Sequence, residues 1–206
     1  LEPTRDTGHS NEELILTVQL PLEDSDLAPT TETGSGISAI LPDLAFRRMS
    51  IVNVIFYGDP ATDADWVLID TGLPTSRQAI IEAAEHRFGV MRPPSAILLT
   101  HGHFDHVGSL ETLAQHWNVP VYAHWLEFPY LNGQASYPPA DPLVGGGAMA
   151  LLSPLYPRSP VNVERRLQPL PQDRSVPFMP GWTWLHTPGH APGHVSLWRA
   201  ADRCLI

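Results

Sequence analysis

The hydrophobic pattern of this chain alternates between short apolar runs and longer segments with helical spacing. Residues 50–57 and 65–70 are rich in β-branched and aromatic side chains. The turn-like sequence GDPATD separates them, so they predict two neighbouring strands. The other runs that predict strands are residues 95–100, 119–123, 182–186, 194–198 and 203–206.

Two segments between these runs predict amphipathic helices. In residues 75–88 the apolar positions are Ile80, Ile81, Ala84 and Phe88. We expect Thr75 or Ser76 to cap this helix and Gly89 to end it. In the second helix, after residue 106, the apolar side carries Val107, Leu110, Leu113, Ala114 and Trp117. Strands that alternate with helices of this size predict a layered α/β fold with helices outside the sheets.

Two other segments show neither the apolar runs of strands nor the spacing of amphipathic helices. Residues 1–36 are polar and acidic, and they predict a mobile arm or edge strands. Residues 131–180 are rich in proline and glycine and too long for an ordinary connection, so a lid or a short helix pair is expected there. A chain of 206 residues that is 43% hydrophobic supports one substantial core, which predicts a single domain over residues 37–206.

Composition restricts the partners and the location. The formal net charge of -10 gives no general attraction to nucleic acid or to an anionic membrane surface, so a small-molecule substrate is expected. A homo-oligomer is left open. Cys204 is the only cysteine and forms no intrachain disulfide, and no apolar stretch is long enough to cross a bilayer. Residues 14–22 lack the basic flank and cleavage site of a signal peptide, so a cytoplasmic location is expected.

Four potential metal ligands lie within six residues directly after the strand expected at residues 95–100. They are His101, His103, Asp105 and His106. In extended backbone, positions 101 and 103 project to the same side, and a turn into a helix can bring the other two round to face them. Imidazole and carboxylate suit zinc and related divalent ions. A solvated histidine cluster is the alternative, but the position at a strand end favours a ligand site.

A second group of histidines lies in the sequence HTPGHAPGH. Its glycines and prolines place His190 at the tip of a tight connection between strands, from where it can reach the first cluster. His194 opens the next strand, which favours a structural role. The histidines without partners in the sequence are His9, His86, His116 and His124.

These motifs resemble those of the metallo-β-lactamase superfamily. THGHFDH resembles the HxHxDH signature, VLIDTG the strand and turn that precede it, and HTPGHAPGHVSLW the downstream histidine motif. The resemblance extends from about residue 50 to residue 206. It implies an αββα sandwich with metals at one edge between two sheets.

Carried over residue by residue, the resemblance implies that His101, His103 and His190 hold one metal, with His190 favoured over its neighbours. Asp105 and His106 would supply part of a second site. The family's bridging aspartate and last histidine would lie beyond residue 206, so the resemblance implies a domain that is incomplete at its C-terminal end. Three histidines with an open position still make a complete mononuclear site.

Two further residues would act on the ligands rather than on the metal. The resemblance implies that Asp70 contacts a ligating imidazole and fixes its orientation, as carboxylates near metal sites commonly do. The alternative for Asp70 is a turn residue that bonds to backbone beside Gly72. His194 is assigned a similar supporting role.

The resemblance implies a metal-dependent hydrolase in which a metal-bound hydroxide attacks a carbonyl of a small ester-like substrate, a thioester or a lactone. Asp105 would orient the nucleophile and accept its proton, which makes it the candidate catalytic residue. The expected cofactor is one or two Zn²⁺ per chain, with Fe or Mn as alternatives.

Other functions are left open. TPGHAPGH resembles the hydroxyacylglutathione hydrolases, although Ser109 stands where many of them have a second glycine. An iron-dependent persulfide dioxygenase on the same fold and a metal-binding but inactive fragment are the main alternatives. The lack of a secretory signal disfavours β-lactam hydrolysis.

Overall fold

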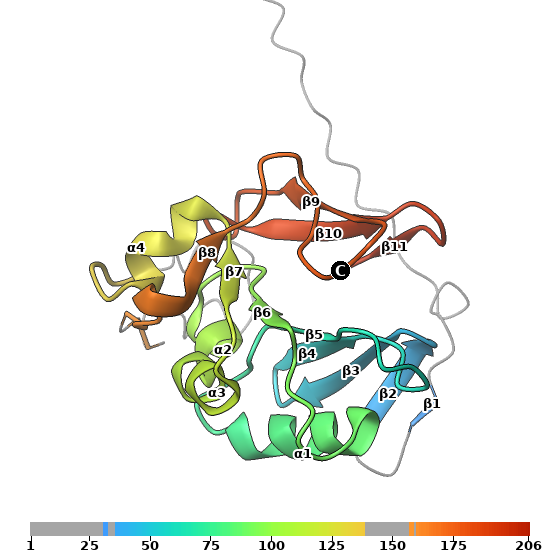
Figure 1. Ribbon diagram of the computed structural model, residues 1–206. Helices are drawn as coiled ribbons and strands as arrows, with labels where there is room; N and C mark the ends of the chain where they lie inside the picture. The colour runs from blue at the N-terminus through green and yellow to red at the C-terminus, as the bar shows by residue number, and fades with distance from the viewer. Residues whose placement is uncertain (1–30, 33–35, 139–156, 159) are drawn as a thin grey trace, which may run out of the picture.

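Two β-sheets and a layer of helices form this computed structural model, which describes residues 31–32, 36–138, 157–158 and 160–206 (Figure 1). The larger sheet has the order β1-β2-β3-β4-β5-β6-β7-β8. Its strands are β1 (Thr31–Glu32), β2 (Ile37–Leu41), β3 (Leu44–Met49), β4 (Val52–Tyr57), β5 (Val67–Ile69), β6 (Ala96–Leu98), β7 (Val121–Ala123) and β8 (Leu167–Pro169). The smaller sheet has the order β11-β10-β9 and consists of β9 (Trp182–His186), β10 (Val195–Arg199) and β11 (Cys204–Leu205).

The helices connect the parallel half of the larger sheet. They are α1 (Arg77–Phe88), α2 (Phe104–Val107), α3 (Leu110–Trp117) and α4 (Phe128–Leu131), with 3-10 turns η2 (Trp125–Glu127) and η4 (Glu164–Arg166). β1 to β5 pair antiparallel, whereas β5, β6, β7 and β8 pair parallel. Parallel neighbours require a crossover, which α1 supplies between β5 and β6, and α2 with α3 between β6 and β7.

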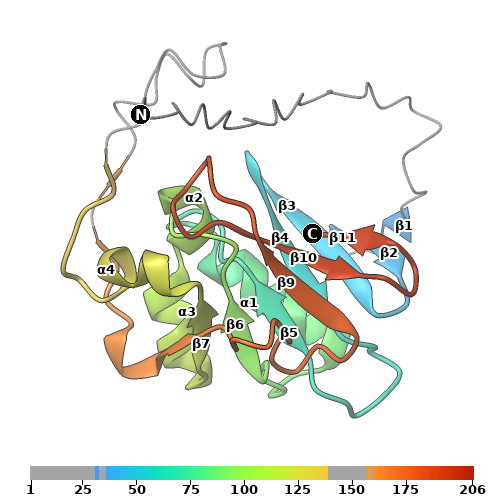
Figure 2. The ribbon, with the colours of Figure 1, turned by 90° about the horizontal axis from the view of Figure 1, so that it is seen from above.

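Each face of the larger sheet packs against a different layer. Leu68 of β5 points to the helices, where it joins a core that includes Ile80 of α1 and Leu113 of α3. Its neighbours Val67 and Ile69 point the other way, into a second core shared with the smaller sheet. The alternation of side chains along a strand therefore builds both cores from one run of apolar residues. Figure 1 shows α1 below the larger sheet and β9 to β11 above it, and Figure 2 shows the smaller sheet from above.

This architecture confirms the layered α/β prediction. The strands expected at residues 50–57, 65–70, 95–100, 119–123, 182–186, 194–198 and 203–206 correspond to β4, β5, β6, β7, β9, β10 and β11. One helical layer and two sheets are present, and the outer face of the smaller sheet carries no helix among the described residues. Within the same residues, no helix has the length and apolar character needed to cross a bilayer.

The helix expected after residue 106 is divided into α2 and α3 at Gly108 and Ser109. A Cβ at Gly108 would lie 2.3 Å from the nitrogen of Pro74, so the chain passes directly against the loop before α1. Ser109 is buried and donates a hydrogen bond to the Leu73 carbonyl at 2.7 Å. Ser76 is the N-cap of α1, but its hydroxyl accepts the Leu73 N–H rather than a first-turn amide.

A lid or a short helix pair was expected in residues 131–180, of which the structure describes only a part. That part contains η4 and β8, which forms an edge of the larger sheet beside β7. Leu170, Val176 and Met179 are buried between the two sheets. Residues 139–156 and 159 lie outside the described residues. Of the predicted arm at residues 1–36, β1 is an edge strand and residues 1–30 lie outside the described part.

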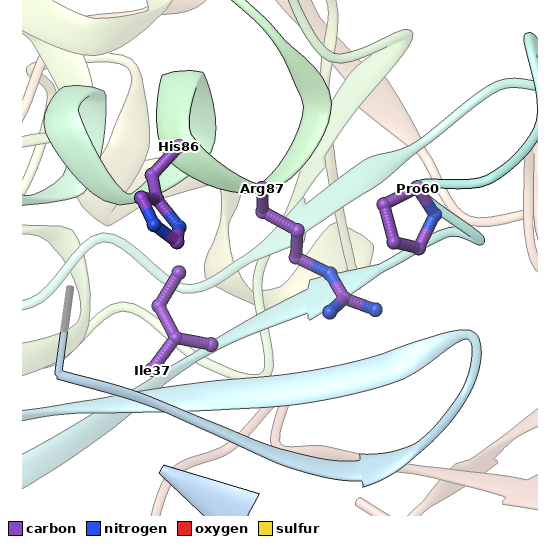
Figure 3. Close-up of a pocket in the computed structure, with 4 residues that line it drawn as sticks. All are labelled: Ile37, Pro60, His86 and Arg87. Atoms are coloured by element: carbon purple, nitrogen blue, oxygen red, sulfur yellow. The ribbon is translucent and has the colours of Figure 1, made fainter. Parts of the chain in front are cut away.

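Two arginine side chains connect separate elements, Arg87 by hydrogen bonds to backbone carbonyls and Arg199 by an ion pair with a carboxylate. Arg87 at the end of α1 donates to the carbonyls of Pro42 and Gly58 at 2.9 and 3.1 Å. The same guanidinium lines a small pocket with Ile37, Pro60 and His86 (Figure 3). Burial lowers the pKa of Arg87, which nearby Asp59 opposes. This pocket therefore lies at a structural joint between α1 and the antiparallel half of the larger sheet.

Arg199 of β10 joins the two sheets. Its guanidinium pairs with Asp43, in the turn between β2 and β3, and lies 4.7 Å from the ring centroid of Trp182. We expect Arg199→Met to lower the free energy of unfolding by about 2 kcal/mol, because it leaves a partly buried carboxylate without its charged partner. Chemical denaturation measures this change. The control Arg203→Met removes the same charge from an exposed side chain. Equal effects of the two variants would show that the Arg199–Asp43 ion pair contributes nothing to stability.

Candidate metal centre

The candidate ligands lie where strands of the two sheets end at the same edge of the molecule. Asp70 follows β5, and His101 follows β6 after Leu99 and Thr100. His103 is the N-cap of α2, which carries Asp105 and His106. His190 comes from the loop between β9 and β10, and Figure 2 shows that this loop lies next to α2. Ligands far apart in the sequence therefore meet because both sheets end here.

His101, His103 and His190 form one compact group. One ligand atom from each lies within 4.8 Å of those of the other two. The distance between His103 Nδ1 and His190 Nε2 is 3.0 Å. The three ring centroids are 4.6 to 4.8 Å apart. The structure thus brings together the three residues that the sequence predicted for the first metal.

The hydrogen bonds around His101 leave its Nε2 with a free lone pair. The Thr100 hydroxyl donates its one proton to Asp70 Oδ2 at 2.7 Å, so toward His101 Nδ1, at 3.0 Å, it acts as an acceptor. Nδ1 then carries the proton of the neutral ring. Nε2 is buried and has no hydrogen-bond partner. An unpartnered buried nitrogen is costly unless something binds it, and a divalent metal fits this position.

Asp70 fixes a second imidazole in the same way. Its Oδ2 accepts a proton from His106 Nδ1 at 2.7 Å, and its Oδ1 accepts the backbone N–H of Thr100 at 2.9 Å. Asp70 is 3% exposed and has a left-handed backbone, with φ of 61°. Of the two interpretations of Asp70, direct contact with a candidate ligand is therefore the one that the structure shows. The contact leaves His106 Nε2 as the unprotonated nitrogen of the neutral ring.

Asp105 and His106 lie beside the three-histidine group without joining it. The ring centroids of His106 and His101 are 4.1 Å apart, and His106 Nε2 lies 3.8 Å from Asp105 Oδ2. Neither residue belongs to the group whose ligand atoms lie within 4.8 Å. Among the described residues, the three histidines therefore form the compact ligand group, and Asp105 and His106 lie at its border.

Burial keeps most of these rings neutral. It lowers the pKa of His101, and it lowers the pKa of His103 to about 4, with His190 adding to both effects. Burial also lowers the pKa of His190. At His106 the effect of burial is outweighed by Asp70, so the pKa is raised. Neutral imidazole is the form that binds metal, so the three-histidine group is in the ligating state at neutral pH.

The neighbouring histidines have other contacts. His194 lies 5.1 Å from His101 between ring centroids, and its Nδ1 is 2.9 Å from the Thr187 hydroxyl. His186 stacks on His124 at 4.3 Å between ring centroids, and its Nε2 donates to the Pro192 carbonyl. His124 thus has a partner that the sequence did not reveal.

Glu127 is the residue beside this site that the sequence analysis missed. Its side chain is 0% exposed, and its two oxygens accept the backbone N–H groups of Gly102 and Gly193. These glycines belong to the two loops that carry the candidate ligands. The signal for Glu127 was available, because it is the one acid in the apolar and aromatic run HWLEFPYL. A buried acid in such a run indicates a specific partner.

Comparison with known proteins places these motifs in a family. The family model described as "Metallo-beta-lactamase superfamily" matches residues 47–206. The "Probable metallo-hydrolase YflN" of Bacillus subtilis is 48% identical over 158 residues, which cover 77% of this chain and 60% of YflN. The "Probable metallo-hydrolase YybB" of the same organism is 33% identical over 69% of this chain and 55% of its own length. The chain therefore spans less than two thirds of the length of these relatives.

Solved structures agree on the fold. A B3 metallo-β-lactamase with an active-site glutamic acid has a TM-score of 0.61 and 20% identity, covering 82% of this chain and 59% of its own. The metallo-β-lactamase SMB-1 has a TM-score of 0.59 and 17% identity, covering 75% of this chain and 54% of its own. At these identities the likeness concerns the arrangement of the sheets and helices.

Proposed function

The chain belongs to the metallo-β-lactamase superfamily, and we propose that it is a metal-dependent hydrolase of small ester-like molecules. The observation that carries this proposal is the unpartnered, buried Nε2 of His101 beside His103 and His190. Three neutral imidazoles with an open position make up the donor set of a hydrolytic metal centre. The similarity to probable metallo-hydrolases supports the same reaction class.

We assign His101, His103 and His190 as the residues that hold the metal, with Zn²⁺ as the expected ion. When bound, such an ion supplies Lewis-acid chemistry that activates water and stabilises negative charge on a carbonyl oxygen. The histidine donor set also suits iron and manganese, so the element is part of the test.

The chain's own residues orient the ligands and accept a proton. Asp70 holds His106 directly and His101 through the Thr100 hydroxyl, which fixes both rings before substrate binds. We propose that an oxygen of the Asp105 carboxylate accepts the proton that an attacking water loses, because Asp105 borders the group while the neighbouring rings serve as ligands.

Thioesters and lactones are the substrates we propose. Their reactive carbonyls match the acyl transfer to water that this donor set supports, and the TPGHAPGH sequence resembles that of thioester hydrolases. The net charge of -10 supports a small molecule over a nucleic acid.

Turnover of a defined substrate panel tests this function. The zinc-loaded chain is assayed with a hydroxyacylglutathione, an aliphatic lactone and a β-lactam, before and after treatment with a chelator. We expect hydrolysis of the thioester or the lactone that is lost on chelation and returns on addition of zinc. Oxygen uptake with a persulfide by the iron-loaded chain, without any hydrolysis, would replace this proposal with dioxygenase chemistry. Metal retention without turnover of either kind would indicate an inactive fragment.

A further inference from the structure

Glu127 connects the two loops that carry the candidate ligands. Its Oε2 accepts the N–H of Gly102, between His101 and His103, at 2.8 Å. Its Oε1 accepts the N–H of Gly193, three residues after His190, at 2.6 Å. The carboxylate belongs to neither loop, because Glu127 is the last residue of η2, which follows β7 in the sequence. One buried side chain therefore spans the joint between the larger and the smaller sheet at the site.

Both glycines are fitted closely to this carboxylate. A Cβ at Gly193 would lie 2.7 Å from the Glu127 Cγ, and a Cβ at Gly102 would lie 3.1 Å from its Oε2. The hydroxyl of Tyr137 also accepts the Gly102 N–H, at 3.2 Å, and the Tyr137 ring packs 4.5 Å from the ring centroid of His103. The contact thus leaves little room for an added methyl group on either glycine.

We propose that Glu127 is a positioning residue for the metal centre, which sets the separation between the His101–Gly102–His103 segment and the loop that carries His190. The inference rests on the proposed function, because it assumes that these histidines bind a metal. A carboxylate suits this role because it offers acceptors on both sides and no donor. It also accepts two backbone N–H groups, of which that of Gly102 is shared with the Tyr137 hydroxyl.

The variant Glu127→Gln tests this role with almost no change in shape. One end of the glutamine amide accepts an N–H, but its NH₂ group faces the other N–H, so one of the two loops loses its tie. We expect the dissociation constant for Zn²⁺ to rise about 10- to 100-fold, which is typical for loss of an outer partner of a ligand. Titration of the whole 206-residue chain against a competing chelator measures this constant, and the visible spectrum of the Co²⁺-loaded chain reports the ligand geometry.

A matched control separates positioning from stability. Leu131→Ala removes a fully buried side chain from the adjacent α4, so it lowers the Tm without touching either loop. We expect Leu131→Ala to keep the wild-type affinity for Zn²⁺ and the wild-type Co²⁺ spectrum, whereas Glu127→Gln alters both. If Glu127→Gln binds Zn²⁺ within twofold of wild type, or if Leu131→Ala weakens binding equally, the positioning role is wrong.

A second variant reaches the same contact from the other side. Gly193→Ala places a methyl group against the Glu127 Cγ and should weaken Zn²⁺ binding to a similar extent. In a Glu127→Ala background, the same change should have little further effect, because both act through one contact. Additive losses would contradict this. If the wild-type chain itself binds no metal, the proposed function fails and this inference fails with it; normal binding by both variants overturns the inference alone.

Discussion

Replacing His101 with alanine is expected to abolish stable metal binding and to reduce hydrolysis by far more than 100-fold. Loss of an outer partner of a ligand costs roughly 10- to 100-fold, and a ligand itself contributes more. His101 is the most buried member of the three-histidine group, and its Nε2 has no other partner. Two histidines on separate loops would remain, too few for a stable tetrahedral site.

The matched control is His116→Ala, which removes an exposed histidine from α3. Both variants are assayed for bound metal by elemental analysis and for turnover of the same substrate, with circular dichroism to verify folding. The control should retain metal and activity. A folded His101→Ala chain with a full complement of metal would show that the metal lies elsewhere.

Asp70→Asn should have the second largest effect on metal binding, because it changes which ring nitrogen carries the proton in His106 and His101. Asp70 only accepts hydrogen bonds, and this forces the proton onto Nδ1 of His106 and, through Thr100, onto Nδ1 of His101. In asparagine one oxygen becomes an NH₂ donor. If it faces Thr100 and His106, both rings must accept at Nδ1, which places a proton on each Nε2.

We therefore expect Asp70→Asn to weaken Zn²⁺ binding at least 10- to 100-fold. Competition with a chelator measures the dissociation constant. The control is Asp63→Asn, which makes the same change at an exposed position shortly before β5. Wild-type affinity in a folded Asp70→Asn chain would mean that the carboxylate does not set the ring tautomers.

The sequence predicted those parts of the fold that local patterns determine. The runs that became β4 to β7 and β9 to β11 carry dense apolar, β-branched or aromatic residues. In α1 the apolar positions that the sequence indicated, Ile80, Ile81, Ala84 and Phe88, are buried. β2, β3 and β8 were not predicted, because their residues mix polar and apolar side chains and become strands through pairing with neighbours. The break between α2 and α3 depends on the approach of Pro74 to Gly108, which local periodicity does not contain.

The same distinction holds for the candidate site. His101, His103, Asp105 and His106 are close in sequence, and the tight loop around His190 indicated that it reaches them. The contacts of Asp70 with His106 and of Glu127 with two glycines span between 25 and 66 residues. Such contacts depend on which strand ends meet, so sequence patterns identify the ligands more readily than the residues that hold them.

The metal content of the purified chain tests the central claim most directly. The chain is prepared without chelators or an affinity metal, and each element is measured per mole of folded protein. The three-histidine geometry predicts close to one divalent ion per chain, with zinc as the expected element. A folded chain that contains essentially no metal and takes up none on titration with Zn²⁺ would contradict the account.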